Sequence, residues 1–324
     1  MSDREIRLGW WLSSEEHDPR CLVEHAMLAE QVGFETAMVS DHLQPWARSQ
    51  GHASHVWTVI GAIAHATDQL EIGTGVTAML NRCHPISVAH AAATAAVMLE
   101  GRFFLGVGTG ERLNEQPFAG RWPRPGERRE CLREAIDMVR RLWGDQSVNA
   151  DGSHWRVENL RLLDRPAVSP PILVAASGAR SARLAGEVGD GIIAVTPDAK
   201  LIDVYRGAGG DGRCHAQLHV SIADTADAAL ANAWRWWPNG AVAPALLAEL
   251  ARPEHFEAIA EGARRDAMHD TVVCATGVEP IVRAIDRFVG SGFDTIYVHQ
   301  IGPDQQRLAD LARAELIPHY RRSS

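Results

Sequence analysis

A closed (β/α)8 barrel is the fold class predicted by three features of this 324-residue sequence. Short β-branched or apolar runs alternate with longer segments of helical periodicity, which is typical of parallel βα units. Eight strand-like runs can be counted along the chain. No G-x-G-x-x-G motif opens a helix directly after a strand, which disfavours the alternative of a doubly wound open sheet. We therefore expect residues 1–324 to form one barrel domain.

The first four predicted strands and their helices occupy residues 7–143. The strands are short apolar or β-branched runs, and the helices repeat apolar residues at helical spacing. Pro85 begins one helix, where its missing N–H group costs nothing. The last helix carries Leu132, Ile136 and Val139 on one face. In chain order, the elements are strand Arg7–Trp11, helix Cys21–Val32, strand Thr36–Ser40, helix Val56–Thr67, strand Leu70–Val76, helix Pro85–Glu100, strand Phe103–Gly108 and helix Glu127–Trp143.

The second half of the chain supplies four more strands and two long stretches without a clear place in the βα alternation. Gly110–Arg165 and Trp237–Thr271 are too long for simple connections, so we expect both to be insertions that help to cover the site. The predicted strands are Ile172–Ala176, Gly191–Val195, Leu218–Ala223 and Thr295–His299, and the predicted helices are Ala179–Val188, Ala226–Trp236, Glu254–Arg265, Pro280–Val289 and Gln305–Leu316.

The composition and charge exclude several classes of protein. Hydrophobic residues make up 46% and charged residues 23% of the chain, as in soluble globular proteins. The formal net charge of −9 argues against nucleic acid as a main partner, because phosphate binding needs a basic face. No apolar run reaches the roughly 18–20 residues that a membrane span needs, and the charged N-terminus lacks a signal-peptide core. We expect a cytoplasmic protein that acts on a small molecule and binds no membrane.

Cysteine and histidine spacing does not predict a metal centre. The five cysteines are scattered and form no C-x-x-C pair. His52 and His55 lie three positions apart, a spacing that can bind a metal on a helix, but no third ligand accompanies them.

The loops that follow the strands are where a barrel of this kind carries its function. After the second strand comes Ser-Asp-His-Leu-Gln-Pro-Trp, with Asp41, His42 and Trp46. An imidazole there can take a proton near neutral pH, and the neighbouring carboxylate and indole can tune and enclose it. The alternative is a buried histidine that makes structural hydrogen bonds.

Small residues follow the third and fourth strands. In the segment from Gly75 through Val76 to Ala78 they would let a planar ring approach the backbone, although glycine also suits bulges and tight packing. The segment Gly108-Thr109-Gly110-Glu111, with Asn114 beyond it, offers backbone amides, a hydroxyl and a carboxylate to a ligand.

Two further groups of residues have two readings each. Ser177, Gly178, Ala179 and Arg180 run into a helix, where free N–H groups and one guanidinium would bind a phosphate, or where the turn is a simple N-cap. The cluster of Trp234, Trp236 and Trp237 is either core of the second insertion or an aromatic wall of the substrate pocket.

Together these segments resemble the luciferase-like superfamily of flavin and deazaflavin enzymes, and within it the F420-dependent glucose-6-phosphate dehydrogenase group. The resemblance covers essentially the whole chain. Its most specific parts are Ser-Asp-His-x-x-Pro-Trp and Gly-Val-Gly-Thr-Gly-Glu-x-x-Asn-Glu. It implies a (β/α)8 barrel, usually a homodimer, that binds coenzyme F420 at the C-terminal face and moves a hydride to or from C5 of the deazaflavin.

The resemblance also implies a role for each matching residue. His42 would accept the substrate hydroxyl proton, Trp46 would stabilise the charge of the intermediate, and Glu111 would protonate N1 of the deazaflavin. Glu15 matches a carboxylate at the substrate mouth. The residues implied in cofactor binding are Asp41, the Gly75–Val76 cis peptide, Ala78, Thr109, Gly110, Glu111 and Asn114 at the ring, and Ser177, Gly178, Ala179 and Arg180 at the tail phosphate.

Departures from the family pattern concern the substrate. Asp198 aligns with a lysine of the sugar-phosphate dehydrogenases, and two further cation positions of that group fall near Leu247 and Thr271. We therefore expect an F420-dependent oxidoreductase acting on a non-phosphorylated alcohol or carbonyl compound. The alternatives are an FMN-dependent monooxygenase or reductase, an F420-dependent sugar-phosphate dehydrogenase, and a barrel that only binds the cofactor.

Overall fold

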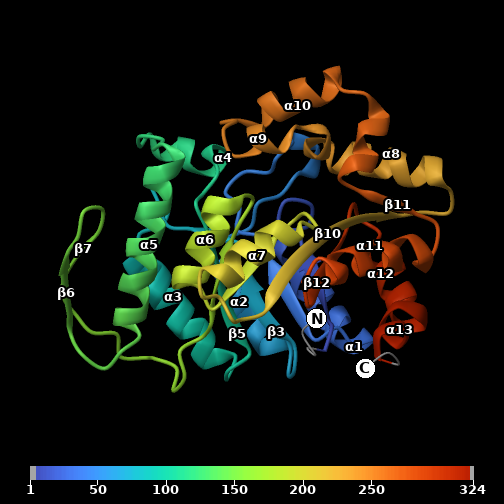
Figure 1. The fold of residues 1–324 in the computed structure, drawn as a ribbon. Helices are drawn as coiled ribbons and strands as arrows, with labels where there is room; N and C mark the ends of the chain where they lie inside the picture. Colours follow the sequence, from blue (N-terminus) through green and yellow to red (C-terminus); the bar gives the residue numbers. More distant parts are fainter. Residues whose placement is uncertain (1–4, 322–324) are drawn as a thin grey trace.

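Eight parallel strands close into a barrel in the computed structural model, which describes residues 5–321 (Figure 1). The last strand of the barrel pairs with the first, and the strand before it pairs with β9, so the ring has no gap. The predicted (β/α)8 fold is confirmed. Around the barrel, the strands are β1 (Arg7–Leu12), β2 (Thr36–Val39), β3 (Glu71–Thr74), β5 (Phe103–Gly108), β8 (Ile172–Ala175), β9 (Gly191–Ala194), β10 (Cys214–Ile222) and β12 (Thr295–Gln300).

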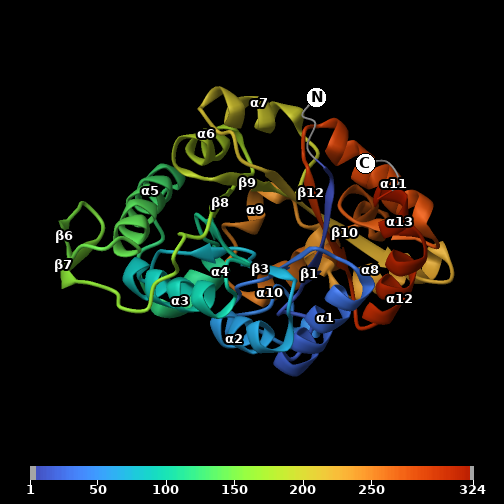
Figure 2. The ribbon, with the colours of Figure 1, turned by 90° about the horizontal axis from the view of Figure 1, so that it is seen from below.

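Helices surround the strands, as Figure 2 shows from below. The first of them illustrates how the sequence sets their bounds: Asp18 caps its N-terminus, Pro19 follows, and Gly33 ends it with a φ of 101°. The surrounding helices are α1 (Pro19–Val32), α2 (Val56–Ala66), α3 (Pro85–Met98), α5 (Pro125–Leu142), α6 (Ala179–Val188), α7 (Ala199–Gly207), α11 (Val278–Gly290), and α12 (Gln305–Leu311), which continues through the π-helical Ala312–Leu316 into α13 (Ile317–Arg321).

The interior of the barrel is filled by side chains rather than left open. Large residues from six of the eight strands pack there as one cluster. Because successive side chains of a strand point to opposite faces, the alternate residues pack outward against the helices. This inner cluster forms a floor on which the loops at the carboxyl ends of the strands rest. Its members are Trp11, Met38, Phe104, Leu173, Ile193 and Tyr297.

A group of short helices covers the carboxyl end of the barrel (Figure 1). Trp46, in the loop after β2, packs with its ring centroid 5.2 Å from that of Phe256 in this cover. The amide of Arg112 donates to the carbonyl of Ala248 over 3.0 Å, which joins the loop after β5 to the same cover. The covering elements are η1 (Arg48–Gln50), α4 (Arg112–Glu115), η2 (Gln116–Phe118), α8 (Ala226–Trp236), η3 (Pro238–Ala241), α9 (Pro244–Leu247), α10 (Pro253–Gly262) and η4 (Arg265–Asp270).

Several elements differ from the sequence-based expectation. Helix α7 was not expected, because only Leu201, Ile202 and Tyr205 of its nine residues are buried and the apolar stripe is short. Strand β10 begins four residues earlier than predicted, since its inward residues His215 and Gln217 are polar and hide the alternation. The predicted strand Leu70–Val76 is shortened to β3, and a separate short strand, β4 (Thr77–Ala78), follows it.

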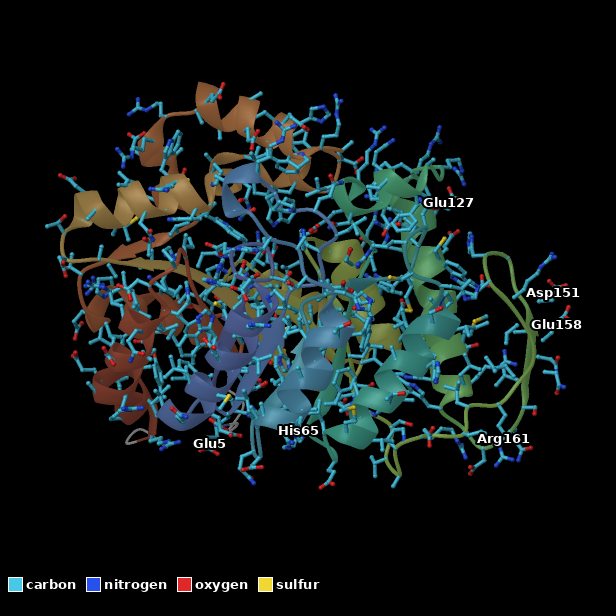
Figure 3. The ribbon with its side chains drawn as sticks, turned by 180° about the vertical axis from the view of Figure 1, so that it is seen from behind. Glu5, His65, Glu127, Asp151, Glu158 and Arg161 are labelled. Atoms are coloured by element: carbon cyan, nitrogen blue, oxygen red, sulfur yellow. The ribbon has the colours of Figure 1, made fainter. Side chains whose placement is uncertain are left out.

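The stretch 110–165 holds both a barrel helix and a hairpin. Helix α5 packs against α3 and α6 in the outer ring. The hairpin of β6 (Val148–Asp151) and β7 (Arg156–Leu160) lies outside that ring, and the labelled Asp151, Glu158 and Arg161 stand at the edge of the molecule (Figure 3). β11 (Val273–Ala275) also was not expected and pairs with the end of β10. Within residues 5–321 we find no helix long and apolar enough to cross a membrane.

Candidate active site

His42 lies at the carboxyl end of β2 and is the centre of a buried polar cluster. Its Nε2 atom is 3.5 Å from Oε1 of Glu15 and 3.4 Å from Oε2 of Glu111. The ring is 9% exposed, and its centroid lies 4.9 Å from that of Trp46. Four residues that the sequence placed in three different loops are thus brought together around one imidazole.

Glu15 is held by a set of hydroxyl groups that sequence reasoning missed. Its Oε2 atom accepts hydrogen bonds from Ser13 over 3.2 Å, from Ser14 over 3.4 Å, and from Ser40. These serines lie at the ends of β1 and β2, which pair as neighbours. The signal in the sequence was the Ser-Ser-Glu run directly after the first strand. With Oε2 engaged in this way, Oε1 is left to face His42.

Asn114 connects the loop after β5 to the His42 loop. Its Oδ1 atom accepts from the amides of Leu43 and Gln44, at 2.8 and 3.3 Å, which fixes the orientation of its side chain. Its Nδ2 atom then lies 3.2 Å from both Oε2 of Glu111 and Nδ1 of His42. Nδ1 also lies 3.1 Å from the carbonyl oxygen of Gln44. His42 therefore has a donor and an acceptor beside Nδ1, so that nitrogen has a partner in either tautomer.

The three ionisable groups of this cluster have shifted pKa values. Burial alone would lower the pKa of His42, but the charges of Glu15 and Glu111 outweigh it, and the pKa is raised. Burial alone would raise the pKa of Glu15, but His42 and the Ser40 hydrogen bond lower it. The pKa of Glu111 is raised, by burial and then by repulsion from Glu15, against the effect of His42. Glu15 is therefore suited to remain an anion and Glu111 to carry a proton, with the imidazole of His42 between them.

Replacing Glu15 by glutamine should shift the pH profile of the enzyme. The substitution removes the charge that raises the pKa of His42 most, so the effect of burial prevails and the pKa of His42 falls. In the direction that needs unprotonated His42, we expect the acidic limb of the kcat/KM profile to move to lower pH by roughly one unit or more. Glu24→Gln, on the exposed face of α1, is the matched control and should leave the profile in place. If the acidic limb of the kcat/KM profile stayed in place in Glu15→Gln, that limb would not report the titration of His42.

A peptide bulge and small residues form the surface next to this cluster. The peptide bond between Gly75 and Val76 is cis, as the resemblance implies. A Cβ atom at Gly75 would lie 2.5 Å from Cη2 of Trp11, and one at Gly108 would lie 2.8 Å from Cγ2 of Val76, so neither position has room for a side chain. Thr109 and Gly110 follow, and Gly110 has a φ of +81° that favours glycine. The bulge is therefore fixed by close packing, with Val76 partly exposed at it.

Asp41 pairs with a cation that the sequence analysis did not single out. Its Oδ1 atom lies 2.8 Å from NH1 of Arg82, and its Oδ2 atom accepts from Oγ1 of Thr77 over 2.7 Å. NH2 of Arg82 also donates to the carbonyl of Asp41 over 3.1 Å. Burial opposes the charge of Arg82, but the pair with Asp41 raises its pKa. The hydroxyl group of Thr77 is thus engaged by Asp41.

The loop from Ser177 to Arg180 follows β8, the neighbour of β5, and leads into α6. Gly178 is the N-cap, it offers no side-chain cap, and a Cβ atom there would meet nothing within 4 Å. Arg180 is exposed, and with Arg128 it lowers the pKa of the neighbouring Arg129, which burial lowers most. An open helix N-terminus with the guanidinium groups of Arg129 and Arg180 beside it is suited to a phosphate.

Loss of Arg180 should weaken binding of the phosphate-bearing cofactor selectively. We expect Arg180→Ala to lower the affinity for F420 roughly tenfold, the effect of one charge-assisted hydrogen bond, while a deazaflavin without the phosphate tail binds as before. Fluorescence titration of both ligands measures this difference. Arg183→Ala, one turn further along the exposed face of α6, is the control. Equal losses for both ligands would place Arg180 away from the tail.

Asp198 has a local structural role. Its Oδ1 atom accepts from the amide of Lys200 over 3.0 Å and caps α7 at the carboxyl end of β9. Its predicted contact with substrate stays a prediction. The tryptophan cluster belongs to the apolar core of the cover: Trp234 and Trp236 pack against it, and the buried Trp237 packs there together with Trp46. Its role as a wall of the substrate pocket stays a prediction.

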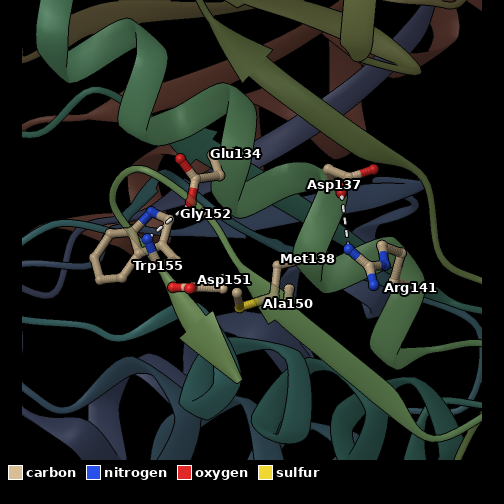
Figure 4. A pocket seen from close by; sticks show the side chains of 8 residues that line it. All are labelled: Glu134, Asp137, Met138, Arg141, Ala150, Asp151, Gly152 and Trp155. Carbon is tan, nitrogen blue, oxygen red and sulfur yellow. Dashed lines mark hydrogen bonds and ion pairs between the residues drawn. The ribbon is translucent and has the colours of Figure 1, made fainter. Parts of the chain in front are cut away.

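A separate pocket lies between α5 and the β6–β7 hairpin, outside the barrel (Figure 4). No predicted site residue lines it. Inside it, Asp137 and Arg141 pair with each other, and Glu134 accepts from the amides of His154 and Trp155. Its walls are therefore explained by the packing of the hairpin. The lining residues are Glu134, Asp137, Met138, Arg141, Ala150, Asp151, Gly152 and Trp155.

Comparison with known proteins identifies the family. The model of the luciferase-like monooxygenase family matches residues 6–313. The chain belongs to this family. It is similar to the F420-dependent glucose-6-phosphate dehydrogenase of Segniliparus rotundus, with 33% identity over 98% of each chain. It is also similar to the F420-dependent hydroxymycolic acid dehydrogenase of Mycobacterium tuberculosis, with 42% identity over 71% of this chain and 67% of the relative.

Among solved structures, a family member with the same architecture is an F420-dependent secondary alcohol dehydrogenase in complex with an F420–acetone adduct. It is 28% identical, the match covers 98% of this chain and 99% of that chain, and the TM-score is 0.91. The fold of this chain is therefore shared with that enzyme over almost its whole length.

Proposed function

We propose that this enzyme transfers a hydride between F420 and a non-phosphorylated secondary alcohol or the corresponding ketone. It is an F420-dependent oxidoreductase: both sequence relatives named above and the solved structure carry that dependence in their names. The finer assignment of substrate is our own. It is carried by one observation, the imidazole of His42 between a carboxylate poised as an anion and a carboxyl group poised to hold a proton.

The residues present fit the cofactor. The close-packed bulge at Gly75–Val76 would support a planar ring beside the partly exposed Thr109 and Gly110, and the N-terminus of α6 suits its phosphate. F420, when bound, accepts or supplies the hydride at C5 of its deazaflavin.

The protein groups handle the proton and exclude water. In alcohol oxidation, Nε2 of His42 takes the hydroxyl proton, and the negative charge of Glu15 stabilises the imidazolium that results. Glu111 holds a proton that it can give up or recover as the direction of the reaction changes. Trp46 is 7% exposed and packs against His42 and Phe256, so the cover keeps bulk water from the imidazole.

Three charged groups near the strand ends argue against a phosphorylated substrate. Enclosing the two charges of a sugar phosphate without cationic partners costs several kcal/mol, by order of magnitude. Arg82 is already engaged by Asp41, and the side chain of Lys200 is exposed on α7. Asp198, beside Lys200, adds a negative charge. The names of the sugar-phosphate dehydrogenase relatives favour the opposite assignment, so an assay must decide between them.

Steady-state assays with F420 and three alcohols test the substrate class. We expect isopropanol and cyclohexanol to be oxidised with kcat/KM at least roughly tenfold above that for glucose-6-phosphate, because each uncompensated charge costs more than one factor of ten. Efficient oxidation of the sugar phosphate, lost in Lys200→Ala, would overturn the assignment. Tight binding of FMN with none of F420, measured on the purified protein, would replace the cofactor and favour an FMN-dependent monooxygenase or reductase.

A further inference from the structure

A second buried polar cluster lies beside the His42 cluster and consists of Glu16, His299 and His219. Oε2 of Glu16 lies 2.6 Å from Nε2 of His299, and the two side chains are 0% and 1% exposed. Nδ1 of His299 lies 2.9 Å from Nδ1 of His219, its partner in the register of β12 and β10. Glu16 directly follows Glu15, the carboxylate that faces His42. The two clusters are thus joined by one peptide unit.

The topology directs both imidazoles into the barrel at its carboxyl end. Tyr297, two residues before His299, belongs to the cluster that fills the barrel, so His299 points inward one layer closer to the site. His219 lies opposite and also points inward. Trp237 packs against both rings, at centroid distances of 5.1 Å to His219 and 4.6 Å to His299, and belongs to the same apolar cluster as Trp46.

Glu16, His299 and His219 form a row of hydrogen-bonded groups, and His219 is its accessible end. Glu16 and His299 are enclosed, whereas the ring of His219 is partly exposed. Its Nδ1 atom is engaged by His299, and no described residue forms a hydrogen bond with its Nε2 atom. Burial and the neighbouring His299 hold the pKa of His219 well below its ordinary value, so the ring is neutral. A neutral imidazole at the carboxyl end of the barrel therefore has one nitrogen without a hydrogen-bond partner among the described residues.

The hydrogen bonds of the row determine whether Nε2 of His219 is a donor or an acceptor. A carboxylate only accepts, so Glu16 requires a proton on Nε2 of His299. When the ring of His299 is neutral, its Nδ1 atom is then an acceptor. His219 must donate from its own Nδ1, which leaves its Nε2 atom without a proton. Nε2 of His219 is thus a hydrogen-bond acceptor.

This row of groups does not lead a proton out of the molecule. Oε1 of Glu16 accepts from the amide of Gly302 over 2.8 Å, so the row ends inside the protein on a backbone group that keeps its proton. A buried carboxylate that orients one imidazole through another acts by fixing a tautomer, as in other carboxylate–histidine pairs.

We propose that His219 binds a second polar group of the substrate, a hydroxyl or N–H donor separate from the carbinol that reacts at His42. Glu16 and His299 are positioning residues that make Nε2 of His219 an acceptor. The inference rests on the proposed function and narrows its substrate class to secondary alcohols that carry a further hydrogen-bond donor, such as diols.

The tautomer can be tested without any substrate, by ¹⁵N NMR of histidine-labelled protein at pH 8. We expect the shift of an unprotonated nitrogen at Nε2 of His219. In Glu16→Gln, the new amide oxygen accepts from the Gly302 amide, and the new amide nitrogen donates to Nε2 of His299. The proton of each imidazole then moves to its other nitrogen, so Nε2 of His219 becomes protonated. Glu261→Gln, exposed on α10, is the control and should change nothing. A protonated Nε2 in the unmodified protein would overturn the proposal.

The substrate role is tested with cyclohexanol, the cyclohexanediols and their monomethyl ethers. We expect the best diol to exceed both its ether and cyclohexanol in kcat/KM by roughly tenfold, the effect of one buried hydrogen bond. His219→Phe should abolish that ratio, and Glu16→Gln should reverse it in favour of the ether, because an N–H now faces the substrate. F420 binding, measured by fluorescence, reports that each variant is folded.

The outcomes separate this inference from the function on which it rests. If no alcohol is oxidised, the proposed function fails, while the NMR result still decides the tautomer. If the alcohols are oxidised but diol, ether and cyclohexanol show equal kcat/KM, or if His219→Phe retains the diol preference, the proposed function stands and the role of His219 is wrong.

Discussion

Replacing His42 by alanine should lower turnover by roughly 10²–10⁴-fold, the range that general acid–base catalysis supplies. The imidazole is the group beside both Glu15 and Glu111, so no neighbouring base occupies the same position. Its contacts are to protein groups of its own cluster, and we expect F420 affinity to change only a few-fold. Pre-steady-state oxidation of a secondary alcohol, followed through the loss of F420 absorbance, separates the chemical step from binding.

The control for this substitution is His65→Ala, a histidine exposed on α2 at the edge of the molecule (Figure 3). It should leave turnover and F420 binding as they are. If His42→Ala retained the rate of the unmodified enzyme, His42 would be a structural residue of the loop after β2. Partial rescue of His42→Ala by added imidazole would support the role as base.

Replacing Arg82 by alanine should lower the free energy of unfolding by about 3–5 kcal/mol, the cost of breaking a buried ion pair and leaving one charge unpaired. The side chains of Arg82 and Asp41 are 9% and 2% exposed, and the pair lies next to Thr77 and the bulge at Gly75–Val76. Chemical denaturation without cofactor measures the loss. F420 should also bind less tightly, because Asp41 loses the partner that orients it.

Arg121→Ala provides the comparison, because Arg121 pairs with Glu127 at the surface, with 70% of its side chain exposed. A pair of that kind contributes little to stability. If Arg82→Ala and Arg121→Ala lowered the free energy of unfolding equally, the Asp41–Arg82 pair would contribute no more to stability than a surface ion pair. A combined Asp41→Asn and Arg82→Met variant should recover part of the loss, because it removes both charges together.

The sequence determined the architecture and the main site residues of this protein for local reasons. The periodicity of strands and helices is a property of consecutive residues, so the eight-stranded parallel barrel could be predicted without knowledge of any long-range contact. The rule that loops after barrel strands carry the function then pointed to the loops that hold Asp41, His42 and Glu111. The Gly75–Val76 bulge followed from the resemblance of its segment to the family. Elements with polar inward residues, such as β10, were misjudged because the usual alternation was hidden.

The partners of those residues were decided only by the tertiary structure. That Ser40 and Ser13 hold Glu15, that Arg82 neutralises Asp41, and that Asn114 bridges two loops depend on which strands are neighbours. The row from Glu16 to His219 joins residues about 200 positions apart, and nothing in the local sequence of either one refers to the other. Hydrogen bonds and charge pairs act over a few ångströms in space, whereas sequence patterns report only the periodicity of one segment, and this is why the chemistry of the site required the fold.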